Sequence, residues 1–190
     1  TAYNYVTRKA TWKIDVNKNE IPLALAKVTD TIPAGMKFLS DTFKVTDKGG
    51  TDVTSTIGGT LTSDVKADDN ITDSDSFTYQ FPASISSTYT ITYETELKEK
   101  YLQDKFSSRD FTNDSTLTTS NYPGSINSSA KVSVKNPIVE KSAGYTAGAS
   151  YISWAVPINE SALDLKDVSI SDPLQSPDLV LDTDSVKLYN

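Results

Sequence analysis

Two aspartates are the acidic residues best placed for chemistry, because each lies among apolar residues on an extended stretch. Asp30 lies in "KVTDTIP", where Val28 and Ile32 flank it at the two-residue spacing of one strand face. Asp172 has the same surroundings in "SISDPL". An inward-facing aspartate is at least partly buried, and burial raises the pKa of a carboxyl group that has no partner. The alternative is a strand-end aspartate that stabilises the turn before the next proline, and spacing alone leaves both interpretations open.

The other reactive side chains give little support to metal-dependent or nucleophilic catalysis. The chain has no cysteine and no histidine, which removes thiolate chemistry, the usual general base and the commonest metal ligand. Four aspartates loosely resemble a calcium loop, but they lack its glycine hinge and terminal glutamate; they are Asp68, Asp69, Asp73 and Asp75. We therefore expect an exposed acidic loop at 64–75, no metal site and no cofactor.

Charge and hydrophobicity exclude further classes of function. The net charge of -7 argues against nucleic acid and anionic membrane surfaces as partners, because both attract basic patches. No stretch is long and apolar enough to span a bilayer, so we expect no membrane insertion within this segment. The hydrophobic fraction of 37% suits a small sandwich whose sheets each keep one face in water.

A long internal repeat sets the unit of the fold. Five residues recur at one constant offset of 142, and the pairs are Tyr3 and Tyr145, Trp12 and Trp154, Asn17 and Asn159, Leu23 and Leu165, and Asp30 and Asp172. At this offset the last residue, Asn190, falls opposite Lys48. We therefore expect one nearly complete module at 1–136, lacking its first strand, and the opening strands of a second, homologous module at 137–190.

The elements that must position these residues are short strands. Apolar residues alternate with polar ones around Trp12 and in "YTITYETEL", "DTFKVTD" and "AKVSVKN", and glycine-rich or proline-rich turns separate these runs. This pattern is typical of an all-β sandwich. The segment 96–103 contains good helix formers and predicts a turn or two of helix. The short link at 134–140 contains Pro137 and no glycine, which predicts a stiff joint between modules.

Aromatic residues on the predicted strands are expected in the core and not at a ligand surface. These residues are Trp12, Trp154, Tyr89, Tyr93 and Phe111.

A family resemblance adds a specific hypothesis. The series "TWKIDVN", "VTDTIPAG", "YTITYETEL", "FTNDSTL" and "IVEKSAG", followed by "SWAVPIN", resembles the collagen-binding-type domains of Gram-positive cell-wall adhesins. The resemblance covers about 3–134 and the opening of the second module. It implies an immunoglobulin-like β-sandwich that forms an intramolecular isopeptide bond.

The resemblance also implies roles for four residues. In that family a lysine on the first strand attacks the side-chain amide of an asparagine on a late strand, an acid assists, and ammonia leaves. Asp30 and Asp172 match the acid, Asn113 matches the amide and Lys141 matches the nucleophile. A dry core suits this chemistry, because burial favours both a neutral amine and a neutral carboxyl group.

The candidate residues come from different modules, so neither triad is complete. Lys141 precedes Trp154 by 13 residues, and the matching position in the first module lies two residues before Thr1. Lys9 and Lys13 are poor substitutes, because an odd spacing from Trp12 directs them outward if Trp12 faces in. Two alternatives follow. A longer polypeptide supplies the missing partners, or the Lys141 segment of a neighbouring chain fills the gap by strand complementation.

The function that we expect is structural and extracellular. The chain is interpreted as a repeat module of a cell-wall-anchored adhesin on the bacterial surface, with neighbouring modules of the same polypeptide as partners. It is not an enzyme beyond a single self-crosslinking event. The alternative is an adhesin module that recognises collagen or another host matrix protein. A glycan-active enzyme or carbohydrate module would need an aromatic platform or paired acids in a cleft, and the sequence shows neither clearly.

Overall fold

The structure, a computed structural model, describes residues 2–68, 70–102, 108–135, 138–160 and 163–189. Its larger part is built from two antiparallel sheets. The first sheet has the order β1 (Ala2–Asn4), β2 (Lys9–Val16), β9 (Tyr89–Leu97) and β5 (Met36–Asp47). The second has the order β11 (Ser125–Lys135), β10 (Ser108–Thr118), β4 (Lys27–Thr31), β7 (Ser76–Gln80) and β6 (Thr60–Asp64). β3 (Leu23–Ala24) and β8 (Ser84–Ile85) form a small extra pair.

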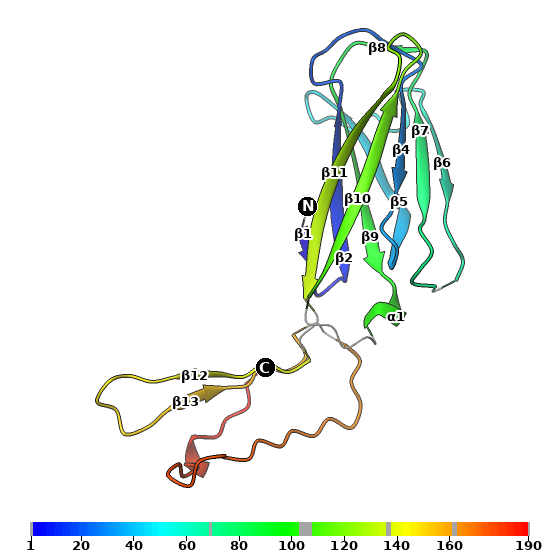
Figure 1. Cartoon of the computed structure of the whole chain (residues 1–190). Helices are drawn as coiled ribbons and strands as arrows, with labels where there is room; N and C mark the ends of the chain where they lie inside the picture. Colours follow the sequence, from blue (N-terminus) through cyan, green and yellow to red (C-terminus); the bar gives the residue numbers. More distant parts are fainter. Residues whose placement is uncertain (1, 69, 103–107, 136–137, 161–162, 190) are drawn as a thin grey trace.

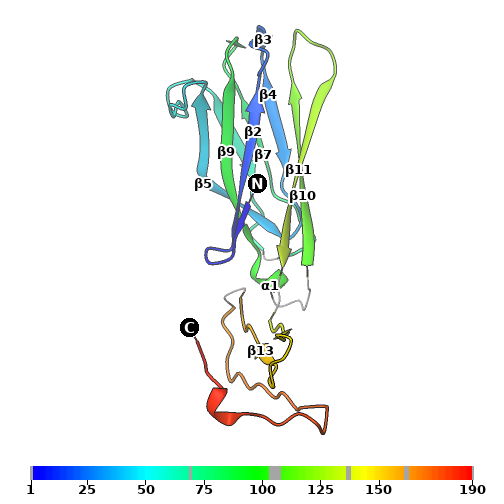
Figure 2. The same ribbon diagram turned by 90° about the vertical axis from the view of Figure 1, so that its left-hand side faces the viewer.

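The two sheets face each other across one hydrophobic core (Figures 1 and 2), which confirms the predicted all-β, immunoglobulin-like sandwich. The predicted alternation also holds. Trp12 and Val16 are buried on β2, while Tyr93 and Ile91 are buried on the adjacent β9. The indole Nε1 of Trp12 donates to Thr95 Oγ1 at 2.9 Å, so even the polar atom of this large side chain is satisfied inside the core.

The predicted helix at 96–103 is wrong at its start. Strand β9 continues to Leu97, and α1 (Glu99–Leu102) is a single turn. Leu97 is buried as the next inward residue of the strand, so packing outweighs the local helix propensity. Gln103 lies outside the described residues.

The expected exposed loop at 64–75 is also partly wrong. Asp75 is fully buried, and its carboxylate accepts hydrogen bonds from the backbone N–H groups of Phe38 at 2.8 Å and Lys66 at 3.0 Å. A buried carboxylate is tolerated because these donors replace water. Asp69 lies outside the described residues.

The same loop is fixed by a buried cation. Lys98 is 3% exposed and its ammonium group donates to the backbone carbonyls of Asn70 at 2.8 Å and Asp73 at 3.2 Å. These bonds connect the end of β9 to the acidic loop. The loop is therefore attached to the core from two sides.

The C-terminal part, 138–189, contains β12 (Ser142–Gly144), β13 (Ser153–Ala155) and a short 3-10 turn, Thr183–Ser185. β12 and β13 form an antiparallel pair in which Ala143 is opposite Trp154. The β1–β2 pair has the same register. Ala2 is opposite Thr11, and the residues 142 positions later, Gly144 and Ser153, are also opposite each other. The repeat in the sequence is thus also a repeat in strand pairing.

Two expectations for this part are wrong. Trp154, expected in a core, is 46% exposed, and Asp172, expected to be at least partly buried, is exposed together with Ile170 and Leu174. The physical reason for the exposure is the same for all four residues. Among the described residues of 138–189 no second sheet faces the β12–β13 pair, so an apolar face there has nothing to pack against.

Candidate functional site

The centre of the sandwich contains a polar pair that connects two neighbouring strands. On β10 the residues Phe111, Asn113 and Ser115 face inward by the two-residue period, and β4 directs Asp30 to the same interior. The register places Ser115 opposite Asp30, so Asn113 is the next inward residue along β10. Asn113 Nδ2 donates to Asp30 Oδ2 at 3.1 Å. The structure therefore brings together two candidate residues that are 83 positions apart in sequence.

A third polar group reaches the pair from the opposite sheet. Asn113 Nδ2 also lies 2.6 Å from the hydroxyl oxygen of Tyr93, which projects from β9. The Tyr93 ring packs edge-on against Phe38 and Phe77, so aromatic side chains surround the polar atoms. Sequence reasoning placed Tyr93 in the core but missed this contact, because strand alternation gives the direction of a side chain and not its partner in the other sheet.

Burial controls the protonation of this cluster. Asp30 is 0% exposed and Asn113 is 4% exposed. Loss of water raises the Asp30 pKa from 3.8 to about 7, although hydrogen bonds from Tyr93 and Asn113 act in the opposite direction. Burial, together with the nearby charge of Asp30, also raises the pKa of Tyr93. Near pH 7 both the neutral and the ionised form of the Asp30 carboxyl group are thus populated, and the group can donate or accept a proton.

Two acceptor atoms of the pair have no hydrogen-bond partner among the described residues. They are Asp30 Oδ1 and Asn113 Oδ1, and both are buried. Unpaired buried acceptors are costly, so the pair still has capacity for a donor.

A small hollow lies beside Asn113, between β2 and the β10–β11 pair. Its volume is about 20 Å³, which is room for about one water molecule or one amine nitrogen. It is lined by Trp12, Lys13, Ile14, Asn113, Ser115, Ser128, Ser129 and Ala130. The amide of Asn113 is therefore accessible to a small group that enters between the two sheets.

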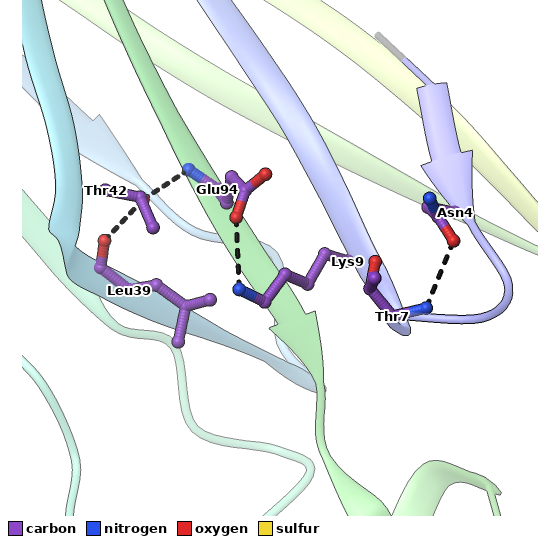
Figure 3. Close-up of polar contacts among 6 residues, drawn as sticks. All are labelled: Asn4, Thr7, Lys9, Leu39, Thr42 and Glu94. Carbon is purple, nitrogen blue, oxygen red and sulfur yellow. Dashed lines mark hydrogen bonds and ion pairs between the residues drawn. The ribbon is translucent and has the colours of Figure 1, made fainter.

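The lysines of β2 do not supply that group. As the strand parity predicted, Lys9 and Lys13 turn away from the core, and their amines pair with Glu94 at 3.2 Å and Asp15 at 3.0 Å. Figure 3 shows the Lys9 side chain directed toward Glu94. The same view shows Thr42, which bridges the irregular part of β5 by donating to the Leu39 carbonyl and accepting from the Glu94 backbone N–H.

The other two candidate residues meet in the C-terminal part. Lys141, one residue before β12, pairs with Asp172 at 2.7 Å. Its ammonium nitrogen also lies 4.3 Å from the ring centroid of Trp154. Asp172 and Trp154 are the repeat counterparts of Asp30 and Trp12. The C-terminal part thus joins a lysine to the acid, and the sandwich joins an asparagine to the equivalent acid.

Comparison with known proteins identifies the family of the chain. A family model described as collagen binding domain matches residues 3–127, which includes Asp30, Tyr93 and Asn113. The chain belongs to the collagen-binding domain family. This family is named for binding and not for catalysis. No match was found among curated protein sequences.

Solved structures with a similar fold come from Gram-positive surface proteins. The collagen-binding subdomain of Enterococcus faecalis surface protein ACE is 12% identical, with a TM-score of 0.42 over 68% of this chain and 88% of that one. The collagen-binding domain of a Staphylococcus aureus adhesin is 18% identical, with a TM-score of 0.43 over 68% and 89%. Domains D2 and D3 of the major pilin SpaD of Corynebacterium diphtheriae are 14% identical, with a TM-score of 0.42 over 74% and 51%.

Two further observations concern the described residues alone. No helix among them is long and apolar enough to cross a membrane. Nor do three or more of their carboxylate side chains gather in a way that could hold a metal ion.

Proposed function

We propose that residues 1–136 are a structural module of a bacterial cell-surface adhesin, and that Asn113 becomes joined to a lysine side chain by an isopeptide bond with Asp30 as the assisting acid. Residues 137–190 would open a second such module. The observation that carries the proposal is the buried contact between Asn113 and Asp30 beside a hollow that can admit an amine. Membership of the collagen-binding domain family supports the surface location.

The strand register indicates where the lysine would stand. Because Ala143 is opposite Trp154, the register places Lys141 opposite Val156. In a polypeptide that continues upstream of Thr1, the equivalent lysine would stand opposite Ile14. Opposed residues of an antiparallel pair lie on the same face of the sheet. Ile14 lines the hollow beside Asn113, so a lysine there would point its amine at the amide.

The reaction balances without an external base or cofactor. The neutral lysine Nζ attacks Cγ of Asn113, a C–N bond forms, the bond from Cγ to Nδ2 breaks, and ammonia leaves. The amine loses one proton and the leaving nitrogen gains one, and the carboxyl group of Asp30 can transfer it. A pKa near 7 suits Asp30 for this exchange, because the group can hold or release the proton at neutral pH.

Tyr93 would stabilise the developing negative charge. A half-turn of the Asn113 amide places Oδ1 where Nδ2 now lies, within reach of both Tyr93 and Asp30. The separation of 2.6 Å from the Tyr93 hydroxyl is typical of an O–H to O hydrogen bond. In that orientation the hydroxyl and the neutral carboxyl group both donate to the oxygen that becomes charged.

A second candidate function is recognition of collagen by the outer surface of the sandwich. The family name supports it, and a shallow groove of about 400 Å³ lies over β10 and β11. The groove is polar, with Asp114, Thr116 and Asn127 in its lining. Binding of a triple-helical peptide to the immobilised chain, compared between the natural chain and Asn127→Lys, tests this role separately from the crosslink.

The crosslink can be tested with residues of this sequence alone. Residues 1–142 joined directly to residues 1–190 form a duplicated chain that keeps the repeat spacing of 142. Lys141 of the first unit then stands two residues before Thr1 of the second unit. The proposal predicts that the intact mass is lower than the calculated mass by one ammonia. With Lys141→Arg in the first unit, or Asn113→Ala in the second unit, the mass should equal the calculated mass. A full mass for the unsubstituted duplicated chain would contradict it.

A further inference from the structure

Two loops of the chain have the same side-chain clamp. In the Asn17 loop (17–21), Nδ2 of Asn17 donates to the Ile21 carbonyl at 2.9 Å, and Oδ1 accepts from the Ile21 N–H at 3.2 Å. In the Asn159 loop (159–163), Nδ2 of Asn159 donates to the Leu163 carbonyl at 2.9 Å, and Oδ1 accepts from the Leu163 N–H at 2.8 Å. The two loops are separated by the repeat offset of 142.

The backbone conformation also agrees at two pairs of described residues. Asn17 has a φ of 60° and Asn159 a φ of 55°, a left-handed conformation that asparagine tolerates better than most residues. Further along, Leu25 and Asp167 have φ values of 50° and 52° at the same offset. The chain therefore repeats both the asparagine clamp and these left-handed positions at the offset of 142.

The surroundings of the two loops differ. Leu163 is partly buried and packs against the hydrophobic core cluster, whose buried members all lie between 10 and 134. Figures 1 and 2 both show the chain after β13 returning to the base of the sandwich beside α1. Ile21, its counterpart, lies between β2 and β3 at the opposite end of the sandwich and is 38% exposed.

The linker explains why the Asn159 loop reaches the base. Val139 bridges to Ile158, and Asn159 N–H donates to the Ile138 carbonyl at 2.8 Å. The described end of the linker therefore pairs with the segment between β13 and the loop. This pairing holds the loop next to the end of the sandwich from which the linker emerges.

We propose that the Asn17 loop is a docking surface for the base of a preceding module of the same repeat, with Ile21 in the place that Leu163 takes on the sandwich. The inference goes beyond the proposed function and does not require the crosslink. The neighbouring residues Leu25 and Tyr122 are also exposed, and they extend the apolar surface that a preceding module would cover. Asn121, bonded to Ala24 N–H and the Pro22 carbonyl, attaches the Tyr122 loop to this end.

The duplicated chain contains one docked and one free copy of this loop, so each molecule carries its own reference. The first unit should carry Lys141→Arg, which removes the crosslink from the comparison. Isoleucine methyl groups are labelled, and a soluble paramagnetic agent reports their accessibility. The proposal predicts two Ile21 signals, one as accessible as in the single chain and one protected. Equal accessibility of both Ile21 methyl groups would overturn it.

A variant distinguishes docking from chance protection. Ile21→Asp in the second unit should restore independent tumbling of the two units in NMR relaxation, whereas Ile126→Asp, an exposed isoleucine on β11, should not. Thermal unfolding of the single chain with Ile21→Asp confirms that the sandwich remains folded. Unchanged joint tumbling in Ile21→Asp would also contradict the proposal. If the two units do not dock but the unsubstituted duplicated chain still loses ammonia, the docking inference is wrong and the crosslink proposal is unaffected.

Discussion

Asp30 is the residue on which the chemistry of the proposed crosslink would depend. It is a buried acid held next to an amide and a phenol, and one of its oxygens has no hydrogen-bond partner in the part of the chain that the structure describes. Its neighbours do not supply a cation among the contacts described here, so burial dominates its protonation. Such a group costs stability when it ionises, and proteins keep costly groups of this kind at functional sites.

The pH dependence of stability should reveal this cost. The folded-state pKa of Asp30 is raised from 3.8 to about 7, so the native state binds a proton that the unfolded chain releases. The free energy of unfolding contributed by Asp30 is therefore full below about pH 4 and decreases as pH rises to about 7. Asp30→Asn, which is neutral at every pH, should gain stability relative to the natural chain across this window. Urea unfolding at a series of pH values measures the difference, and a difference that does not change with pH would contradict the raised pKa.

Tyr93 should matter through its hydroxyl and not only through its ring. Tyr93→Phe keeps the aromatic packing but removes the group 2.6 Å from Asn113 Nδ2. We expect a loss of about 1 kcal/mol in the free energy of unfolding of the single chain. In the duplicated chain we expect slower ammonia release, which a packing role alone would not cause. Tyr89→Phe, at the edge of the core, is the control; an identical rate in both variants would remove Tyr93 from the site.

At the scale of the elements, strand periodicity predicts which side chains point into the core, but it does not predict which residues they contact there. The inward faces around Trp12 and Tyr93, and the inward direction of Asp30, follow from the two-residue alternation. The contact between Asp30 and Asn113 does not follow from it, because strand order over 83 residues is set by the packing of whole sheets. Only the family resemblance suggested that contact.

The same limit explains the errors. Trp154 lies in the same local pattern as Trp12 but is exposed, because burial needs a facing sheet, and the described residues of 138–189 form none. The acidic composition of 64–75 predicts an exposed loop, but Asp75 is buried, because it accepts a hydrogen bond from Phe38, 37 residues earlier in the chain. Local composition contains neither fact.

The acidic loop should depend on one buried lysine. Lys98→Met keeps the aliphatic stem but removes the three donors of the ammonium group, leaving the carbonyls of Asn70 and Asp73 without it. We expect a loss on the order of 1–3 kcal/mol in stability and faster amide hydrogen exchange in the loop. Lys100→Met, an exposed position on α1, is the matched control. Equal exchange in the loop for both variants would show that Lys98 does not hold it.

At the scale of the whole molecule, the proposed crosslink would combine complementary residues from two successive modules. The sandwich contributes Asp30 and Asn113, and the C-terminal part shows a lysine paired with the equivalent acid. A bond from the strand before β1 to β10 would connect the two sheets covalently. Pulling force would then pass through a covalent bond, where strand hydrogen bonds alone could shear.

The single chain, in contrast, should keep its amide. Lys9 and Lys13 point outward, so we expect its mass under denaturing conditions to equal the calculated mass. A monomer lighter by one ammonia would mean that an internal lysine reaches Asn113. Covalent dimers, each junction lighter by one ammonia, would instead indicate that Lys141 of one chain reacts with another.

Peptide mapping of the duplicated chain by tandem mass spectrometry tests the central claim most directly. The account predicts one branched peptide, in which Lys141 of the first unit is joined to Asn113 of the second unit with loss of one ammonia. Lys141→Arg should abolish it, and Asp30→Asn in the second unit should abolish or greatly slow it. Only linear peptides, or a branch through Lys9 or Lys13, would contradict the assignment of the site.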